Sequence, residues 1–320
     1  MVWLSGIVDY RTAEEILTQV GQVTVSDSSV WRQAQEWGQS FQSIAEAERI
    51  RATVLPGRWG KPCRDTSAKG RMGVAIDGAM IHVLEEGWKE LKIGCVFDVQ
   101  VRPTLDKETG SRIELAHAVN CSYVAHLGGP EMLGQMVWAE ASRRGWEQAI
   151  DTQVLGDAAL WIWNIAAEHF YDSHQVVDWY HGTEHLASAA RLLKGEGTLA
   201  CTRWFNNRKT VLFEGHADRI AQELILAAPD HPAVVETLTK EANYLLKNQR
   251  RMNYQEMRED GWAIGSGMVE SAAKQFKARF TGPGMRWSRI GAERLLPVRA
   301  AIMSQRFDHL WSLAYNSPPN

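Results

Sequence analysis

The chain has 320 residues, of which 35 are Lys or Arg and 38 are Asp or Glu, giving a formal net charge of −3. A charge this close to zero excludes a uniformly basic nucleic-acid-binding protein, so any surface for a polyanion must be a local cluster of basic residues. The four cysteines (Cys63, Cys95, Cys121 and Cys201) form no C-x-x-C pair, which excludes a disulfide framework and a cysteine-ligated zinc site. Because we find neither a secretion signal nor an apolar run of about 18 residues, we expect a soluble, cytoplasmic protein.

Residues 1–55 have a helical pattern. Residues 13–20 form one helical run, and Ser26 or Asp27 is placed to cap a second helix. Two helices joined in this way resemble a helix-turn-helix, so residues 1–55 are a candidate DNA-binding segment. Residues 56–70 are polar and are predicted to be a linker.

Residues 71–181 change to a pattern rich in strands. Three strands are predicted at 72–83, 91–101 and 113–127, with turns at 85–88 and 106–110. Helices are then predicted at 130–145 and 158–170, and short strands at 152–155 and 175–178. Three meandering strands followed by alternating helices and strands predict an α/β fold with a mixed sheet and flanking helices. This is the element order of the ribonuclease H-like fold.

The rest of the chain is predicted to be helical. Residues 182–260 have helical periodicity and no strand pattern, and we interpret them as a helical insertion. Residues 261–300 contain a glycine-rich turn, a helix that carries Glu270, and a basic loop, and they would complete the core. Residues 301–320 are predicted to be a C-terminal tail.

Three acidic residues are placed to form a metal site. Asp77 lies on the first strand and Asp157 ends the fourth, and these strands are neighbours in a ribonuclease H-like sheet. Because adjacent strands lie about 4.8 Å apart, two such carboxylates can bridge metal ions that are about 4 Å apart. Glu270, near the start of a later helix, would supply the third carboxylate. Oxygen ligands of this kind favour Mg²⁺ or Mn²⁺.

Asp178 and His181 are predicted to support this site rather than to bind its metal. Asp178 ends the fifth strand, about 10 Å from Asp77 across the sheet, which is too far to share an ion directly. His181 could instead orient a phosphate or a metal-bound water. The alternative is that both residues only cap the helix that follows.

A basic segment follows Glu270. Lys274 and Lys277 recur four and seven residues after Glu270, so the three side chains point to the same side of a helix. Such a face suits a metal ligand beside the phosphates of a polyanion, and the loop after the helix adds a tryptophan as a stacking surface. The predicted DNA-binding residues are Lys274, Lys277, Arg279, Arg286, Trp287 and Arg289. The alternatives are a solvated basic face and packing of Trp287 in the core.

Four motifs occur in order between residues 71 and 299. They are Val74-Ala-Ile-Asp77-Gly-Ala79, Gly156-Asp157-Ala-Ala-Leu-Trp161, Val176-Val-Asp178-Trp-Tyr-His181, and Gly265-Ser-Gly-Met-Val-Glu270 with Gly284-Met-Arg-Trp-Ser288. Together they resemble the motifs of the DDE transposases of bacterial insertion sequences, in the Mutator-like branch and specifically the Kra group.

This resemblance implies roles, partners and a location. Asp77, Asp157 and Glu270 would be the catalytic metal ligands, and Asp178-x-x-His181 would be the accessory motif of the branch. The activity would be DNA strand cleavage and transfer with two Mg²⁺ ions, for which Mn²⁺ can substitute. The partners would be double-stranded DNA at the transposon ends, target DNA and further copies of the chain in a synaptic complex, in the bacterial cytoplasm and on the nucleoid. The chain departs from its relatives in having Asp157-Ala-Ala rather than Asp-Gly-Ala, and in a short N-terminal region.

A further motif predicts a different enzyme. His181-Gly-Thr-Glu184-His185 matches H-x-x-E-H, in which two histidines one helical turn apart bind zinc and the glutamate acts as a base. Glu270 would then be the third zinc ligand of a metalloprotease. This alternative leaves Asp77 and Asp157 without a role. A third hypothesis, a domesticated DNA-binding protein that does not cut, gains no support, because all three acids are present.

Overall fold

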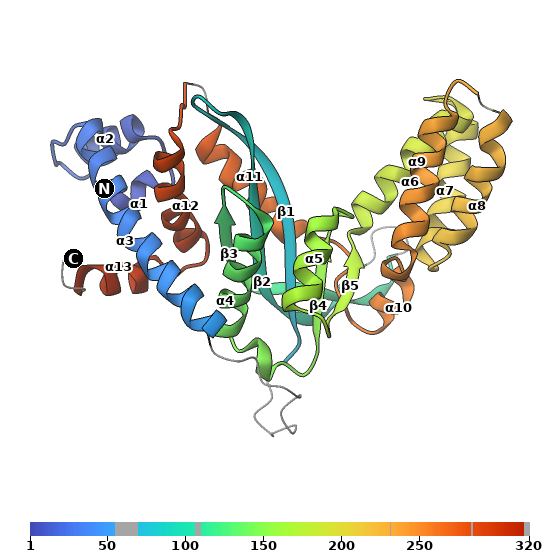
Figure 1. The fold of residues 1–320 in the computed structure, drawn as a ribbon, viewed down its shortest axis with the longest axis horizontal. Coiled ribbons are helices and arrows are strands. Elements are labelled where there is room, and N and C mark those ends of the chain that lie inside the picture. The colour runs from blue at the N-terminus through green and yellow to red at the C-terminus, as the bar shows by residue number, and fades with distance from the viewer. Residues whose placement is uncertain (55–69, 106–109, 231, 283, 317–320) are drawn as a thin grey trace. The chain divides into compact units, whose positions relative to one another are not determined.

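The computed structural model describes residues 1–54, 70–105, 110–230, 232–282 and 284–316 (Figure 1). The chain forms two compact units. The first comprises Met1–Phe97, Asn120–Ile150 and Gly267–Asn320, and the second comprises Asp98–Val119 and Asp151–Ser266. The predicted linker at 56–70 lies outside the described residues apart from Gly70, and the predicted turn at 106–110 lies outside them apart from Gly110.

Five strands form a mixed sheet flanked by helices, which confirms the predicted α/β class. The strands are β1 (Met72–Val83), β2 (Gly87–Leu105), β3 (Arg112–His126), β4 (Thr152–Gly156) and β5 (His174–Val177), in the order β3-β2-β1-β4-β5. Every residue of β4 is buried, as is typical of a strand covered on both faces. β2 extends beyond the predicted 91–101 at both ends, where no residue is buried and the sequence therefore lacks the pattern of a core strand. The arrangement is compatible with a ribonuclease H-like fold.

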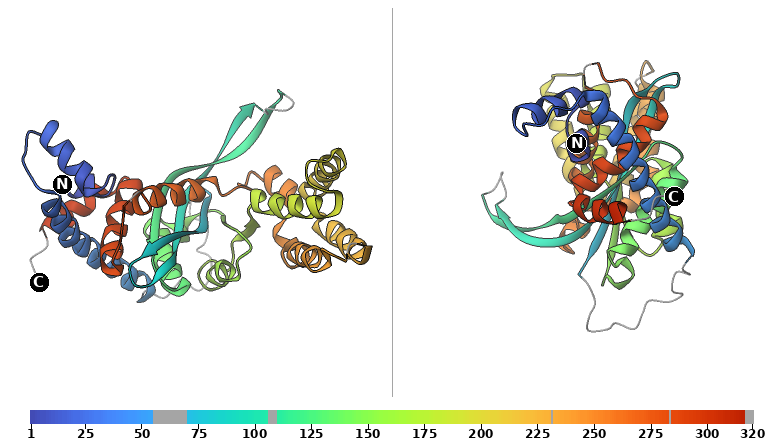
Figure 2. Two further views of the ribbon diagram at one scale, coloured as in Figure 1. Left: turned by 90° about the horizontal axis from the view of Figure 1, so that it is seen from above. Right: turned by 90° about the vertical axis from the view of Figure 1, so that its left-hand side faces the viewer.

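The first unit is built around one long helix. Its helices are α1 (Val2–Ser5), α2 (Tyr10–Gln19), α3 (Asp27–Val54), α4 (Pro130–Arg143), α11 (Gly267–Phe280), α12 (Arg289–Met303) and α13 (Phe307–Asn316). α3 contacts α1, α2, α4, α12 and α13, and the N-terminal helices lie beside α12 and α13 in Figure 2. Val30, Ala34 and Phe41 recur at helical spacing and are fully buried, so α3 supplies a continuous face of the core.

The pair α2–α3 differs from the predicted helix-turn-helix. α3 has 28 residues, and residues 20–26 connect it to α2 by a segment longer than the three- to four-residue turn of that motif. Of the two predicted caps, Ser26 precedes the helix and its Oγ accepts the Ser29 N–H at 3.3 Å, whereas Asp27 is already helical. The length of α3 follows from its buried face, which continues well past the first turns.

The prediction of a C-terminal tail over residues 301–320 was wrong for most of that segment. α13 spans Phe307–Asn316, with Leu310 and Ala314 buried one turn apart. Trp311 lies on Trp37 of α3, with 4.3 Å between the ring centroids. The spacing of these apolar residues is helical, so the segment packs as a helix rather than trailing into solvent.

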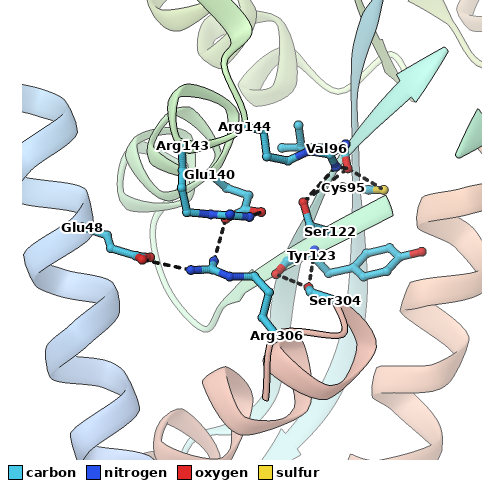
Figure 3. A network of polar contacts seen from close by, with 10 residues as sticks. All are labelled: Glu48, Cys95, Val96, Ser122, Tyr123, Glu140, Arg143, Arg144, Ser304 and Arg306. Atoms are coloured by element: carbon cyan, nitrogen blue, oxygen red, sulfur yellow. Dashed lines mark hydrogen bonds and ion pairs between the residues drawn. The ribbon is translucent and has the colours of Figure 1, made fainter. Parts of the chain in front are cut away.

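A buried ion-pair network joins α3 and α4 in the first unit (Figure 3). Arg306 donates to Glu140 and to Glu48, each at 2.9 Å. Glu140 also pairs with Arg143, and its side chain is only 4% exposed. Because two arginines converge on one buried carboxylate, the network holds α3, α4 and the residue just before α13 in one arrangement.

The second unit is mainly helical outside its strands. Its helices are α5 (Leu160–His169), α6 (Trp179–Lys194), α7 (Leu199–Phe213), α8 (Ala217–Ala227), α9 (Val235–Asn248) and α10 (Tyr254–Glu259). α6 packs against α7 and α9, and α8 packs against the same two helices. α6 begins three residues before the predicted start at Gly182, because the Asp178 side chain caps it by accepting the His181 N–H at 2.9 Å.

Candidate functional site

Two aspartates of the second unit follow neighbouring strand ends. β4 and β5 pair in parallel with Gly156 opposite Val177, and the Asp178 N–H donates to the Gly156 carbonyl at 2.8 Å. Asp157 and Asp178 are the next residues after these strands, so both carboxylates lie at the same edge of the pair. Asp157 is half-buried, and its Oδ1 accepts the Ala159 N–H at 2.8 Å.

Asp178 is the more deeply buried of the two aspartates, and three hydrogen bonds hold it. Its side chain is fully buried and accepts the backbone N–H of His181 at 2.9 Å and that of Ser266 at 2.5 Å. Its Oδ1 also lies 3.2 Å from His181 Nδ1. Burial raises the pKa of the Asp178 carboxyl, but the hydrogen bonds from His181 and Ser266 outweigh burial and leave this pKa below its usual range.

His181 is positively charged at neutral pH as a result. The hydrogen bond to Asp178 raises the pKa of His181 to about 9, although burial opposes the shift. Asp157 is close enough to add to this rise through its negative charge. Since Nδ1 is turned to Asp178, Nε2 remains as the ring nitrogen that can donate to a phosphate oxygen or a water.

The chain segment that contacts Asp178 leads directly to Glu270. The Trp179 N–H donates to the Ile264 carbonyl at 2.9 Å, next to the contact between Ser266 and Asp178. A Cβ on Gly265 would lie 3.3 Å from the Tyr180 ring and 3.9 Å from Asp178 Oδ2, so a small residue lets this segment pass close to α6. α11 begins at Gly267, and Glu270 lies in its first turn.

Asp178, His181 and Glu270 form a group that could hold a metal ion. Each residue offers one ligand atom, and the three atoms lie within 4.8 Å of one another. Two carboxylates and an imidazole are a donor set for a divalent cation. His181 must lose its proton before it can bind a metal.

Asp77 lies in the first unit on the strand that α11 covers. It follows the fully buried run of residues 72–76 and is half-buried, and its Oδ1 accepts the Gly78 N–H at 2.7 Å. α11, the helix of Glu270, packs against β1. Two of the three predicted catalytic acids therefore lie on elements that are in contact.

The structure groups the predicted site residues differently from the sequence prediction. Asp178 and His181, which were predicted to support the site, are grouped with Glu270, and neither Asp77 nor Asp157 belongs to that group of ligand atoms. Metal binding by Asp77 and Asp157 stays a prediction. The contact of the backbone of residues 264–266 with Asp178 and α6 was not predicted from the sequence, where the Gly265-Ser-Gly turn is its signal.

The H-x-x-E-H motif does not bring its two histidines to one metal group in the described part of the chain. His185 Nδ1 lies 2.6 Å from Glu241, and the His185 ring stacks on Tyr244 with centroids 3.5 Å apart. Glu184 is exposed. Only His181 joins the group of possible metal ligands.

Two of the predicted DNA-binding residues lie in the core of the first unit, which corrects that part of the prediction. Arg279 is 2% exposed, and its Nε donates to the Ser5 carbonyl at 2.7 Å. Trp287 is 5% exposed, and its Nε1 donates to the Phe280 carbonyl at 2.9 Å. The Arg279 guanidinium lies over the Trp287 ring, 5.0 Å from its centroid. In these positions neither side chain can reach a phosphate or a base.

The other four predicted DNA-binding residues differ in how available they are. Lys274, Lys277 and Arg286 are exposed, and among the described residues none of them forms an ion pair. Arg289 begins α12 and donates through Nε to Glu86 at 2.7 Å, and through Nη1 to Glu293 at 3.2 Å. The first three are therefore the cations that a polyanion could contact without breaking an existing pair.

Comparisons with known proteins add no family to these observations. The sequence matches no protein-family model, and no curated protein matches it. Within the described residues, no helix has both the length and the apolar character needed to cross a membrane.

Proposed function

We propose that this protein is a DNA transposase of the DDE type, which cuts DNA at the ends of a mobile element and joins them to a target. The observation that carries the proposal is that the ligand atom of Glu270 lies within 4.8 Å of those of the hydrogen-bonded pair Asp178 and His181. Its support comes from Asp77 on β1, against which the Glu270 helix packs, and from Asp157 beside Asp178 at the strand ends. A site rich in carboxylates beside exposed lysines suits a substrate whose reacting groups are phosphates.

Each side chain has a chemical role in this proposal. Asp77, Asp157 and Glu270 would bind two Mg²⁺ ions, or Mn²⁺, and these ions would activate the attacking oxygen and stabilise the leaving one. Asp178 keeps His181 protonated and turns its Nδ1 inward. His181 then donates through Nε2 to a phosphate oxygen, which neutralises part of the charge of the bound strand.

The proposed partners are double-stranded DNA at the element's ends, target DNA and a second copy of the chain. Lys274 and Lys277 stand four and seven residues after Glu270 on α11 and are exposed, so they are placed to bind phosphates next to the reacting strand. Joining two DNA ends in one complex requires at least two protomers. The proposed location is the bacterial cytoplasm, on the nucleoid.

Cleavage and strand transfer on linear DNA that carries the element's own ends test the proposal. Asp77→Asn, Asp157→Asn and Glu270→Gln should each reduce the rate at least about 10³-fold, because each would remove a metal ligand that acts on the reacting phosphate. Glu184→Gln is the matched control, because Glu184 is an exposed carboxylate three residues after His181, and this variant should retain activity. A wild-type protein that binds these ends but never cuts them with Mg²⁺ or Mn²⁺ would instead support a non-cutting DNA-binding protein.

The zinc-protease alternative has less support. His185 is bound to Glu241 and stacked on Tyr244, so the second zinc ligand of the motif is already occupied. The exposed lysines of α11 also have no role in peptide hydrolysis.

A further inference from the structure

The first unit carries an exposed aromatic surface at the turn between β1 and β2. Trp88, near the start of β2, is 63% exposed, although a tryptophan usually buries most of its surface. Its ring meets the exposed His82 of β1 edge to face, with centroids 5.6 Å apart and an interplanar angle of 86°. Leu84, also exposed, follows His82 on the same side of the chain.

The basic loop after α11 is fixed beside this turn. The Leu84 N–H donates to the Trp287 carbonyl at 2.8 Å, and Val83 forms an isolated parallel bridge with Trp287. Since the Trp287 indole is buried and donates to the Phe280 carbonyl, it anchors the loop to the core of the first unit. Arg286, the residue before this anchor, is held beside the β1–β2 turn and is exposed.

A hollow of about 460 Å³ lies between the turn and the loop. It is lined by His82, Leu84, Gly284, Met285 and Arg286. None of these is acidic, and Arg286 forms no ion pair among the described residues. The nearby Glu86 is neutralised by Arg289 at 2.5 Å and by Lys89 at 3.7 Å, while Glu85 is exposed at the tip of the turn. The lining thus combines an imidazole, apolar side chains and one unpaired cation.

We infer that the hollow and the adjoining Trp88 ring bind a nucleotide of single-stranded DNA, with the base stacked on Trp88 beside His82 and the phosphate on Arg286 in the hollow. Base stacking on an exposed aromatic ring together with a cation for the backbone is how proteins bind unpaired strands. Trp287, which was predicted to be the stacking residue, therefore anchors the surface, and Trp88 provides the stacking ring. The inference rests on the proposed function for the choice of DNA as partner, because a strand unpaired at a cleaved end would be its source.

Binding of a fluorescein-labelled oligothymidylate of about 20 nucleotides to the full-length protein, followed by anisotropy in EDTA, tests the inference. Trp88→Ala should weaken binding about tenfold, and Trp88→Phe should keep most of the affinity. Tyr171→Ala is the matched control, because Tyr171 is a 75% exposed aromatic residue between α5 and β5, and it should change nothing. Arg286→Ala should weaken binding and reduce the slope of log affinity against log salt by about one.

An oligonucleotide of the same length with abasic sites separates the contribution of base stacking to binding from that of the phosphate charges. The wild type should bind it about tenfold more weakly than the oligothymidylate, and Trp88→Ala should bind both about equally. A Trp88→Ala protein with wild-type affinity for the oligothymidylate overturns the inference, as does a wild type that binds neither oligonucleotide. EDTA removes metal-dependent chemistry, so this assay measures binding alone. If binding depends on Trp88 but the protein has no cleavage activity, the proposed function is wrong and the inferred binding surface stands. If the protein cleaves DNA but its binding does not depend on Trp88, the proposed function stands and the inferred binding surface is wrong.

Discussion

Replacing Arg279 with methionine should destabilise the first unit while leaving DNA binding by the folded protein unchanged. Arg279 is 2% exposed, and its guanidinium donates to the Ser5 carbonyl at 2.7 Å and lies 5.1 Å and 5.0 Å from the ring centroids of Tyr10 and Trp287. No carboxylate lies within ion-pair distance among the described residues, and burial lowers the pKa of Arg279. The side chain therefore ties α11 to the end of α1.

The contacts set the expected size of the effect. The charged hydrogen bond to Ser5 contributes about 1.5–3 kcal/mol, and each ring contact about 1 kcal/mol. Methionine fills most of the space and carries no charge, so the cost of burying an unpaired charge disappears, which offsets about 2 kcal/mol of the loss. The net loss is about 2 kcal/mol in the free energy of unfolding, or about 5 °C in Tm. Arg279→Ala should lose about 4 kcal/mol, because it also leaves a cavity.

Urea unfolding followed by circular dichroism measures the stability, and fluorescence anisotropy measures the affinity for duplex DNA. Lys277→Met is the matched control, because Lys277 is exposed on the same helix two residues earlier. It should change stability by less than about 0.5 kcal/mol and weaken DNA binding. An Arg279→Met protein that is as stable as the wild type but binds DNA more weakly would show that Arg279 faces DNA and would refute this reasoning.

The remaining predictions concern charged groups elsewhere in the chain. The raised pKa of His181 means that its protonated form stabilises the folded state. This contribution is about 2 kcal/mol after allowance for a side chain that is one-third exposed. It is fully present below about pH 6.5 and is lost as pH rises through about 9. In chelated protein, Asp178→Asn should abolish this pH dependence, and NMR titration should show the pKa of His181 falling by well over one pH unit. Glu140→Gln should lower the free energy of unfolding by about 3 kcal/mol in urea, because Arg306 and a second arginine lose a buried partner. His185→Ala should leave metal-dependent DNA cleavage within about threefold of the wild type. Elemental analysis should show that this variant loses no stoichiometric zinc, and loss of bound zinc would favour the zinc protease.

The sequence predicted most of the regular elements because their signals are local. β1 begins and ends where the pattern predicts, at Met72 and Val83, because the end of a polar segment marks its start and a predicted turn at 85–88 follows its end. The predicted role of Arg279 failed for a reason that the sequence already contained. Arg279 lies three residues after Phe276 and seven after Ala272, so it belongs to the buried face of α11 rather than to the face of Lys277.

The grouping of Asp178 with Glu270 could not be read from local patterns. Strand spacing predicts about 10 Å between Asp178 and Asp77 across the sheet, which is too far for the two carboxylates to share an ion. The contact that matters is made by the backbone of Ser266, 88 residues further along the chain. A backbone N–H has no side-chain identity to reveal its partner, so only the folded chain shows that the turn before α11 ends on this carboxylate.

The two aspartates at the ends of β4 and β5 divide the work of the proposed site because their surroundings differ. Asp178 is fully buried, and its oxygens already receive His181 and the backbone of Ser266, so binding a metal would compete with the contacts that hold α6 and the start of α11. Asp157 is half-buried and accepts one backbone hydrogen bond, which leaves lone pairs for an ion. A carboxylate that must bind and release metal with each substrate needs that openness, whereas one that fixes a protonated histidine needs burial. Asp178 therefore places His181 and the chain that leads to Glu270, and in the proposed transposase Asp157 would be the acid that binds the metal.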